Sequence, residues 1–325
     1  MELDLNKRLV ENVMKYIPKN KKPVMYLVNT LNISRESAYR RIRGDIPFTV
    51  AEMITLATKL EFSIDTVYEQ EKQNYAFYDF SRIENKSADF FLLMIKKYNE
   101  MLEKMSYSKK VEIMMAFNTF PPPFYASFSN LFKFTYYKWL YQDKEVNRNM
   151  SFSETIMSDE IIVLQKKMKI NMMKSTNVIL ILDMNIFLNL IKEIQYFYQR
   201  KLLTDEELIL LKEDTLHLIE LYEEMVQTGI FGSARIQLYL SSLCVNSNAV
   251  YYSYDDKIDP LFWIFTVNPV VIQNTEFASM QKKWLNSLKR QSALISQSNE
   301  ILQAEFFFQQ HDYIDKYLSV ENALF

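Results

Sequence analysis

The sequence predicts an all-α amino-terminal unit over residues 1–70, followed by a larger, mainly helical α+β unit over residues 75–325 with a small antiparallel sheet. The chain of 325 residues is longer than one hydrophobic core usually serves. Apolar side chains recur at helical spacing over residues 5–69, and the polar run 69–74 after them is typical of a linker. Segments of alternating apolar residues occur only later in the chain, which predicts strands in the second unit alone.

The first two helices are predicted from apolar residues that recur every three or four positions. The first spans residues 5–17 and stops before Pro18, and the second begins at Pro23, because proline is favoured in the first turn of a helix. Asn32 and Ile33 then form a turn. The apolar faces of the two helices consist of Leu5, Leu9, Val13, Ile17, Val24, Leu27, Val28 and Leu31.

Capping residues predict the next two helices. Ser34 can cap a basic helix that ends at Gly44, where glycine tolerates the left-handed conformation. Thr49 and Glu52, three residues apart, form a capping box for a fourth helix, and a short fifth helix begins at Ser63. The core positions of the fourth helix are Met53, Ile54, Ala57 and Leu60.

Helices and strands are mixed in the predicted second unit. The helices cover residues 87–105, 124–141, 151–172, 185–199, 204–227, 275–289 and 293–311. Capping boxes at Ser151 and at Thr204 support two of their starts. Residues 110–117 and 178–182 are expected to be strands. Three alternating segments with turn-rich connections predict an antiparallel meander: Ile236, Leu238 and Leu240; Val250, Tyr252 and Tyr254; Leu261, Trp263, Phe265 and Val267.

The composition argues against most familiar enzyme classes. The chain has three glycines, two histidines and one cysteine. Dinucleotide fingerprints and phosphate-binding loops need clustered glycines, which Gly44, Gly229 and Gly232 do not supply. Histidine-dependent hydrolysis and zinc chemistry have few candidate residues, and Cys244 alone is expected to be a small buried side chain. We therefore expect no enzyme, no cofactor and no metal.

The distribution of apolar residues also bears on location. The longest apolar runs, such as 90–95 and 178–182, are far shorter than the roughly 20 residues that span a bilayer, and no signal-peptide core is evident. One cysteine is compatible with a reducing compartment. The sequence therefore predicts a cytoplasmic protein with no membrane partner.

A strong local charge asymmetry lies near the start of the chain. Residues 19–43 contain one acid, Glu36, and seven basic residues, a local net charge of +6 in a chain whose net charge is −2. The basic residues are Lys19, Lys21, Lys22, Arg35, Arg40, Arg41 and Arg43. Phosphates of double-stranded DNA attract such a surface independently of base sequence.

The order of elements in this segment matches a way of reading DNA. A short helix, a tight turn and a capped basic helix form a helix-turn-helix, in which the second helix enters the major groove. Arginine donors suit guanine, a glutamate can accept from cytosine, and serine or tyrosine can contact bases or phosphates. The first turns of the basic helix hold Ser34, Arg35, Glu36, Ser37, Tyr39 and Arg40.

The same residues resemble the lambda-repressor-like (Cro/XRE-type) helix-turn-helix family. The resemblance is carried by residues 24–68 and is strongest in LNISRESAYRRIRGDIPFTVAEMITLATKLEFSIDTVY. It implies a sequence-specific transcriptional regulator, with base contacts from Arg35, Glu36, Tyr39 and Arg40 and phosphate contacts from Lys22, Ser37 and Arg41. Family members commonly carry glutamines early in both helices. Here Pro23 and Arg35 or Glu36 stand nearby, so the base preference is open.

The second unit is expected to regulate DNA binding by the amino-terminal unit. Two recognition helices about 34 Å apart would fit a palindromic site, so we expect a homodimer. The second unit would dimerise, sense a small-molecule or protein effector, or do both. The alternative function is an interaction scaffold, in which the helix-turn-helix docks protein and not DNA.

Two further patterns leave alternatives open. The aromatic segment 124–141 is apolar on nearly all sides, which is typical of a buried helix or a subunit interface, while a ligand pocket lined by its rings is the alternative. Asp214, His217, Glu220 and Glu224 share one helical face. A solvated polar face is the preferred interpretation, with metal binding as the alternative.

Overall fold

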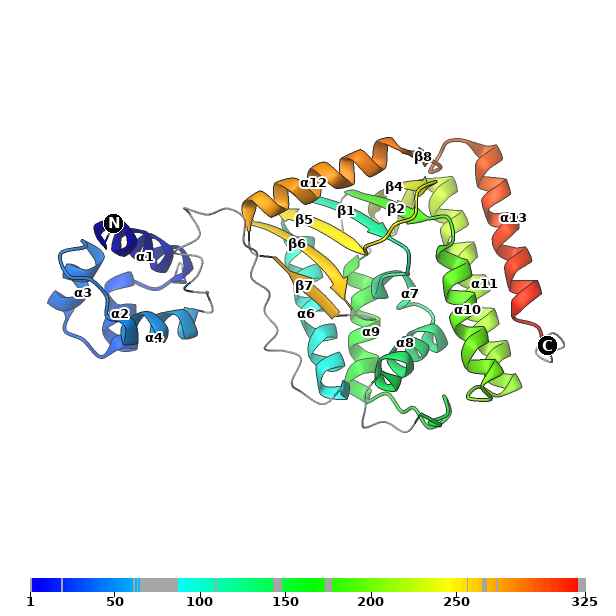
Figure 1. The fold of residues 1–325 in the computed structure, drawn as a ribbon, viewed down its shortest axis with the longest axis horizontal. Coiled ribbons are helices and arrows are strands. Elements are labelled where there is room, and N and C mark those ends of the chain that lie inside the picture. The colour runs from blue at the N-terminus through cyan, green and yellow to red at the C-terminus, as the bar shows by residue number, and fades with distance from the viewer. Residues whose placement is uncertain are drawn as a thin grey trace. The chain divides into compact units, whose positions relative to one another are not determined.

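The chain divides into two compact units, Met1–Tyr75 and Ala76–Phe325, which are described separately (Figure 1). The predicted linker over residues 69–74 lies outside the described residues, as does the predicted fifth helix apart from Ile64. The computed structural model describes residues 2–18, 20–60, 62, 64, 87–108, 110–142, 148–172, 177–255, 257–264, 268–272 and 274–320.

Unit 1 is a bundle of short helices around one small core. Its described helices are α1 (Glu2–Tyr16), α2 (Pro23–Leu31), α3 (Arg35–Ile42) and α4 (Val50–Leu60). Ile54 is an exception to the predicted core, because its side chain is 53% exposed. The buried apolar residues of this core are Leu9, Val13, Ile17, Leu27, Ala38, Phe48, Leu56, Ala57, Leu60 and Phe62.

The predicted caps of unit 1 are present. The Ser37 amide donates to Ser34 Oγ over 3.1 Å, which satisfies one of the free amides at the start of α3. The Glu52 amide donates to Thr49 Oγ1 over 3.2 Å, and the Thr49 amide donates to Glu52 Oε2 over 2.9 Å, which completes the capping box of α4. Gly44 has a φ of +81°, so the turn after α3 uses the left-handed conformation that glycine tolerates best.

Unit 2 contains an eight-stranded mixed sheet, so the prediction of a small antiparallel sheet was wrong. The order of hydrogen-bonded neighbours is β3-β4-β2-β1-β5-β6-β7, and β8 pairs with β4. The strands are β1 (Val111–Phe117), β2 (Asn177–Asp183), β3 (Ile230–Phe231), β4 (Ala234–Ser241), β5 (Ala249–Tyr254), β6 (Lys257–Ile264), β7 (Asn268–Val271) and β8 (Ser292–Leu294).

The predicted meander is only partly present. β5 and β6 pair antiparallel, but β4 pairs with β2 in parallel, and β5 pairs with β1. β1 and β2 are parallel, with Met115 opposite Leu180. Alternating side chains indicate that a segment is a strand, but they do not indicate which strands pair with it. Here helices connect β1 to β2 and β2 to β4, so the pairing depends on how segments distant in the sequence pack together. The last two positions of the third predicted segment, Phe265 and Val267, lie outside the described residues.

Three predicted helix boundaries also need correction. The aromatic segment forms two helices, α7 (Pro122–Tyr125) and α8 (Ser129–Tyr141). The Ser151 amide donates to Glu154 Oε2 over 2.6 Å, but this local contact closes a turn, and α9 begins only at Asp159. The predicted last helix starts later, after β8. The other helices are α6 (Ser87–Tyr107), α9 (Asp159–Met172), α10 (Ile186–Gln199), α11 (Asp205–Thr228), α12 (Thr275–Arg290) and α13 (Glu300–Tyr317).

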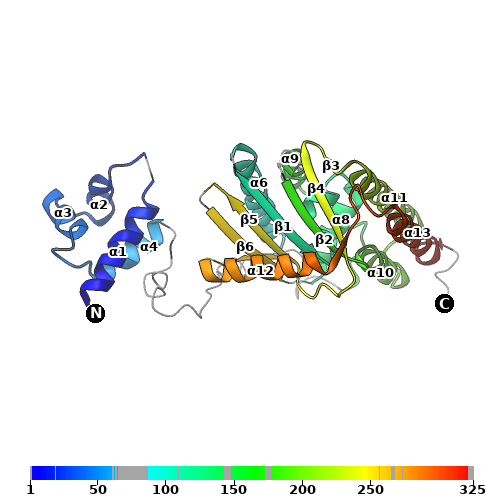
Figure 2. The same ribbon diagram turned by 90° about the horizontal axis from the view of Figure 1, so that it is seen from above.

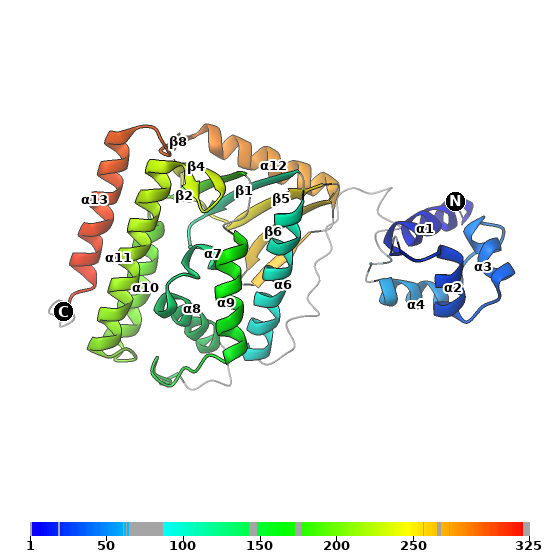
Figure 3. The same ribbon diagram turned by 180° about the vertical axis from the view of Figure 1, so that it is seen from behind.

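Helices cover both faces of the sheet (Figures 2 and 3). Ile113 and Met115 of β1 belong to the main core with α6, α8, α10 and α11, whereas Met114 and Ala116 face a smaller core. That smaller core is closed by Leu285 and its neighbours on α12. Successive residues of β1 therefore face opposite layers, which explains why the strand is almost wholly apolar.

Two single residues differ from expectation. Cys244 follows β4 in an exposed loop and is not buried. Asp214 of α11 is not simply solvated, because its Oδ2 accepts from the Asn130 and Leu131 amides over 2.8 and 3.1 Å. A carboxylate thus caps the start of α8 from a neighbouring helix.

None of the helices in the described residues combines the length and apolarity that a membrane span requires.

Candidate nucleic-acid interface

The outward side of α3 carries the predicted base-contact residues. Arg35, Glu36, Tyr39 and Arg40 are all exposed, and Tyr39 is 53% exposed. At 100° per residue, these positions fall within an arc of about 140° on the helix. Ala38, which is fully buried, points the opposite way into the core. The helix thus presents two arginines, an acid and a phenol on a single solvent-facing side.

The start of α2 supplies the second part of the predicted interface. Lys22 is exposed and has an extended backbone, and Pro23 is the first residue of the helix. Asn32 ends α2 with a φ of +53°, and the chain enters α3 three residues later at Arg35. This connection is as short as the turn of a helix-turn-helix, and α2 packs against α3.

Arg41 faces inward, although the resemblance makes it a candidate for phosphate contact. Its side chain is 10% exposed. Nε donates to Glu52 Oε2 over 3.1 Å and Nη2 donates to Oε1 over 2.8 Å, while Nη1 donates to Ser37 Oγ over 2.6 Å. The guanidinium therefore joins α3 to α4. It also bonds to the hydroxyl of Ser37, which is another candidate for phosphate contact.

Glu52 supports the candidate interface in a way that the sequence does not predict. The sequence indicates its place in a capping box, but not its ion pair with Arg41. The spacing along the helix could have indicated that Arg41 faces the core. Arg41 is three residues after Ala38, so the two side chains lie on the same, buried side of α3. Burial alone would raise the pKa of Glu52, but the Thr49 amide and the bonds and charge of Arg41 outweigh that effect and lower it.

An Arg41→Met variant is expected to destabilise unit 1 by about 1–2 kcal/mol, because Glu52 loses its ion pair while remaining partly buried. Hydrogen exchange of the amides in residues 35–60 of the full chain should become faster. Lys59→Met removes an exposed lysine from α4 and serves as the control. Unchanged exchange in Arg41→Met would contradict the positioning role.

The stability of unit 1 should also depend on pH through Glu52. Because folding lowers the pKa of Glu52, its contribution is fully present above the ordinary glutamate pKa of about 4.3 and is lost as the pH falls through the lower folded value. Hydrogen exchange in α3 and α4 should therefore accelerate in that acidic range. The Glu52→Gln variant should show a weaker dependence, and an identical pH profile would contradict this assignment.

The metal alternative at Asp214, His217, Glu220 and Glu224 gains no support. Among the residues that the structure describes, no three His, Cys, Asp or Glu side chains are placed to hold a metal ion. Asp214 is engaged with the amides of α8. The four side chains share a helix face without forming a coordination site.

No protein-family model, curated protein or solved structure matches the chain.

Proposed function

We propose that the protein is a sequence-specific DNA-binding transcriptional regulator whose α3 enters the major groove. The observation that carries the proposal is the exposed side of α3, where Arg35, Glu36, Tyr39 and Arg40 stand together on a helix fixed from behind by Arg41 and Glu52. Arginine reads guanine edges, and the exposed glutamate can accept from cytosine. Ser34 and Lys22 flank this side and would contact the phosphate backbone.

The chemistry of the exposed side favours nucleic acid over the scaffold alternative. The centres of protein interfaces are usually apolar and aromatic, and they are depleted of lysine and of acidic residues. The exposed side of α3 has one aromatic residue, Tyr39, among charged neighbours, and the basic side chains outnumber Glu36. Such a surface suits phosphates and base edges. We propose that the protein is cytoplasmic and binds DNA as a homodimer, at a site with two-fold symmetry.

Selection of bound sequences from random double-stranded DNA tests the proposal with the full chain. We expect enrichment of a defined site, with two half-sites about one helical turn apart. A gel shift at low and moderate salt should then show tighter binding to that site than to random DNA. Absence of enrichment, together with absence of any salt-sensitive binding, would overturn DNA binding and favour the scaffold.

Lys22→Ala should weaken selected and random DNA alike. Its ammonium would contact a phosphate, so its loss should reduce the slope of log affinity against log salt by about 1. Lys59→Ala is the matched control, because it removes an exposed lysine of the same unit from α4. A loss confined to the selected site would show that Lys22 contacts a base.

A further inference from the structure

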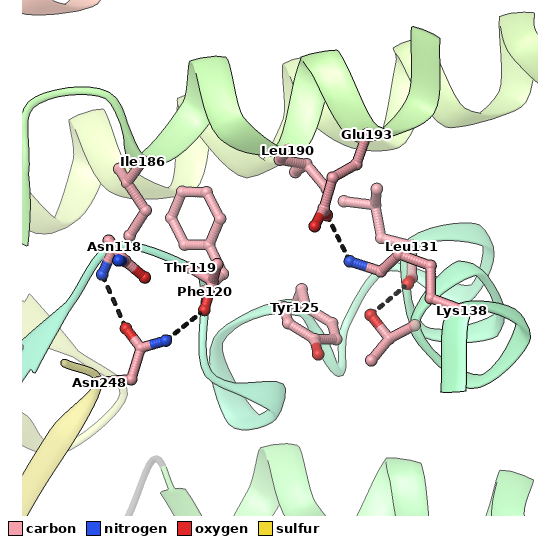
Figure 4. Close-up of a pocket in the computed structure, with 11 residues that line it drawn as sticks. Asn118, Thr119, Phe120, Tyr125, Leu131, Lys138, Ile186, Leu190, Glu193 and Asn248 are labelled. Atoms are coloured by element: carbon pink, nitrogen blue, oxygen red, sulfur yellow. Dashed lines mark hydrogen bonds and ion pairs between the residues drawn. The ribbon is translucent and has the colours of Figure 1, made fainter. Parts of the chain in front are cut away.

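Unit 2 contains a cavity at the carboxyl end of β1. It measures about 270 Å³ and lies between the segment after β1, the start of β5, and helices α8 and α10 (Figure 4). Ligands of open α/β sheets bind beyond the carboxyl ends of the parallel strands. The volume is slightly below the usual range for drug-sized ligands, so it suits a molecule with the size of a small metabolite.

One end of the cavity is formed by amides and a hydroxyl. Asn248 Oδ1 accepts from the Asn118 amide over 2.8 Å, and Asn248 Nδ2 donates to Thr119 Oγ1 over 2.7 Å. Asn189 Nδ2 donates to the Asn118 carbonyl over 3.0 Å from behind. These bonds fix a neutral polar wall that joins the ends of β1 and β5 (Figure 4).

The middle of the cavity is mostly apolar, although Thr135 and Tyr125 also line it. Phe120, Leu131 and Ile186 are buried, and Leu190 completes this wall from α10. Tyr125 is 6% exposed, and burial raises the pKa of its hydroxyl far above the usual range, so the phenol stays neutral. This part of the cavity can enclose a hydrocarbon group.

An ion pair occupies the other end. Lys138 Nζ of α8 donates to Glu193 Oε2 of α10 over 2.5 Å, and the two side chains are 14% and 42% exposed. The same two residues also line an outer depression with Tyr141, Gln142, Lys192, Tyr196 and Phe197. The pair therefore stands between the cavity and the outer surface, and both charges can reach a ligand from either side.

We propose that this cavity binds a small zwitterion, namely a free α-amino acid with an apolar or amide side chain. Its carboxylate would bind Lys138, its ammonium would bind Glu193, and its side chain would lie along Phe120 and Ile186 toward the amides of Asn118 and Asn248. A ligand with both charges gives each member of the ion pair a new partner. A ligand with one charge would engage only one member of the pair and would add an unbalanced net charge to a partly buried site, which is costly.

Calorimetric titration of the full chain with L-leucine, L-phenylalanine and L-glutamine tests the proposal. The probes for charge are L-leucinamide, which lacks the carboxylate, and N-acetyl-L-leucine, which lacks the ammonium. At least one of the three amino acids should bind at millimolar concentration or below. The two leucine derivatives should bind about tenfold or more weakly than leucine, because each loses a charge-assisted contact.

Variants locate the site. Glu193→Gln keeps the shape of a half-exposed side chain and should weaken amino-acid binding about tenfold. Leu190→Trp should abolish binding by filling the cavity. Lys212→Met breaks an ion pair with Asp315 outside the cavity and should leave binding unchanged. Circular dichroism confirms that each variant is folded.

Three results would overturn the proposal: no heat from any of the three amino acids, equal affinity for a singly charged derivative, or unchanged binding in both Glu193→Gln and Leu190→Trp. The inference does not depend on DNA binding, because the titration is performed without DNA.

Discussion

The double variant Arg35→Ala, Arg40→Ala is expected to lose about 2–6 kcal/mol of binding free energy for the selected DNA site, from about 1–3 kcal/mol for each base-reading arginine. Both side chains are exposed on the same side of α3. Neither is needed to hold the helix in place, since Arg41 and Glu52 perform that role. The loss should therefore appear in affinity and not in the stability of unit 1.

The measurement compares selected and random DNA at one salt concentration for the wild type, the double variant and the single variant Arg40→Ala. Random DNA should lose less affinity than the selected site, because only base contacts distinguish the two. Lys22→Ala is the control for a phosphate contact. If Arg40→Ala and Lys22→Ala each reduce affinity for the two DNAs equally, the assignment of base reading to α3 is contradicted.

Phe187→Ala should lower the free energy of unfolding of unit 2 by about 3–5 kcal/mol. Phe187 is fully buried near the start of α10. Its ring centroid lies 4.7 Å from that of Phe120, 5.7 Å from Tyr222 and 6.2 Å from Phe306. These neighbours come from the loop after β1, from α11 and from α13, so a cavity at Phe187 removes contacts to three separate segments.

Tryptophan fluorescence during urea denaturation measures this effect for unit 2 alone. The three tryptophans, Trp139, Trp263 and Trp284, all belong to unit 2. Phe308→Ala is the matched control, because that phenylalanine lies on α13 but is 77% exposed, and its loss should change stability by less than about 0.5 kcal/mol. Equal effects of the two substitutions would contradict the packing described for this core.

Most local structure of unit 1 could be predicted because it depends on neighbouring residues. Ser34 bonds to an amide three positions away, and Thr49 and Glu52 bond to each other across the same distance. Helix capping acts within one turn, so a sequence pattern is sufficient to locate it. The failure at Ser151 shows the limit, since the same local bonds there close a turn without a helix.

The candidate interface was predictable only in part. The exposed residues of α3 follow from charge and helical phase. The role of Arg41 depends on Glu52, which is 11 positions away on another helix. Basic residues next to one another in the sequence look equivalent, but Arg40 lies outside and Arg41 forms a nearly buried ion pair. The packing of α3 against α4 decides between these two roles.

The sequence by itself indicated the longer strands β1, β2, β4, β5 and β6, because alternation of apolar side chains is a property of each segment, but it did not indicate the short strands β3, β7 and β8. Only the tertiary structure decided their order. β1 and β2 pair although more than fifty residues separate them, and β4 joins β2 in preference to β5. Such pairings form when distant segments bury both faces of a sheet together, and no periodicity within one strand records its neighbour. The cavity has the same origin, because α8, α10 and the ends of β1 and β5 enclose it only after the sheet is assembled.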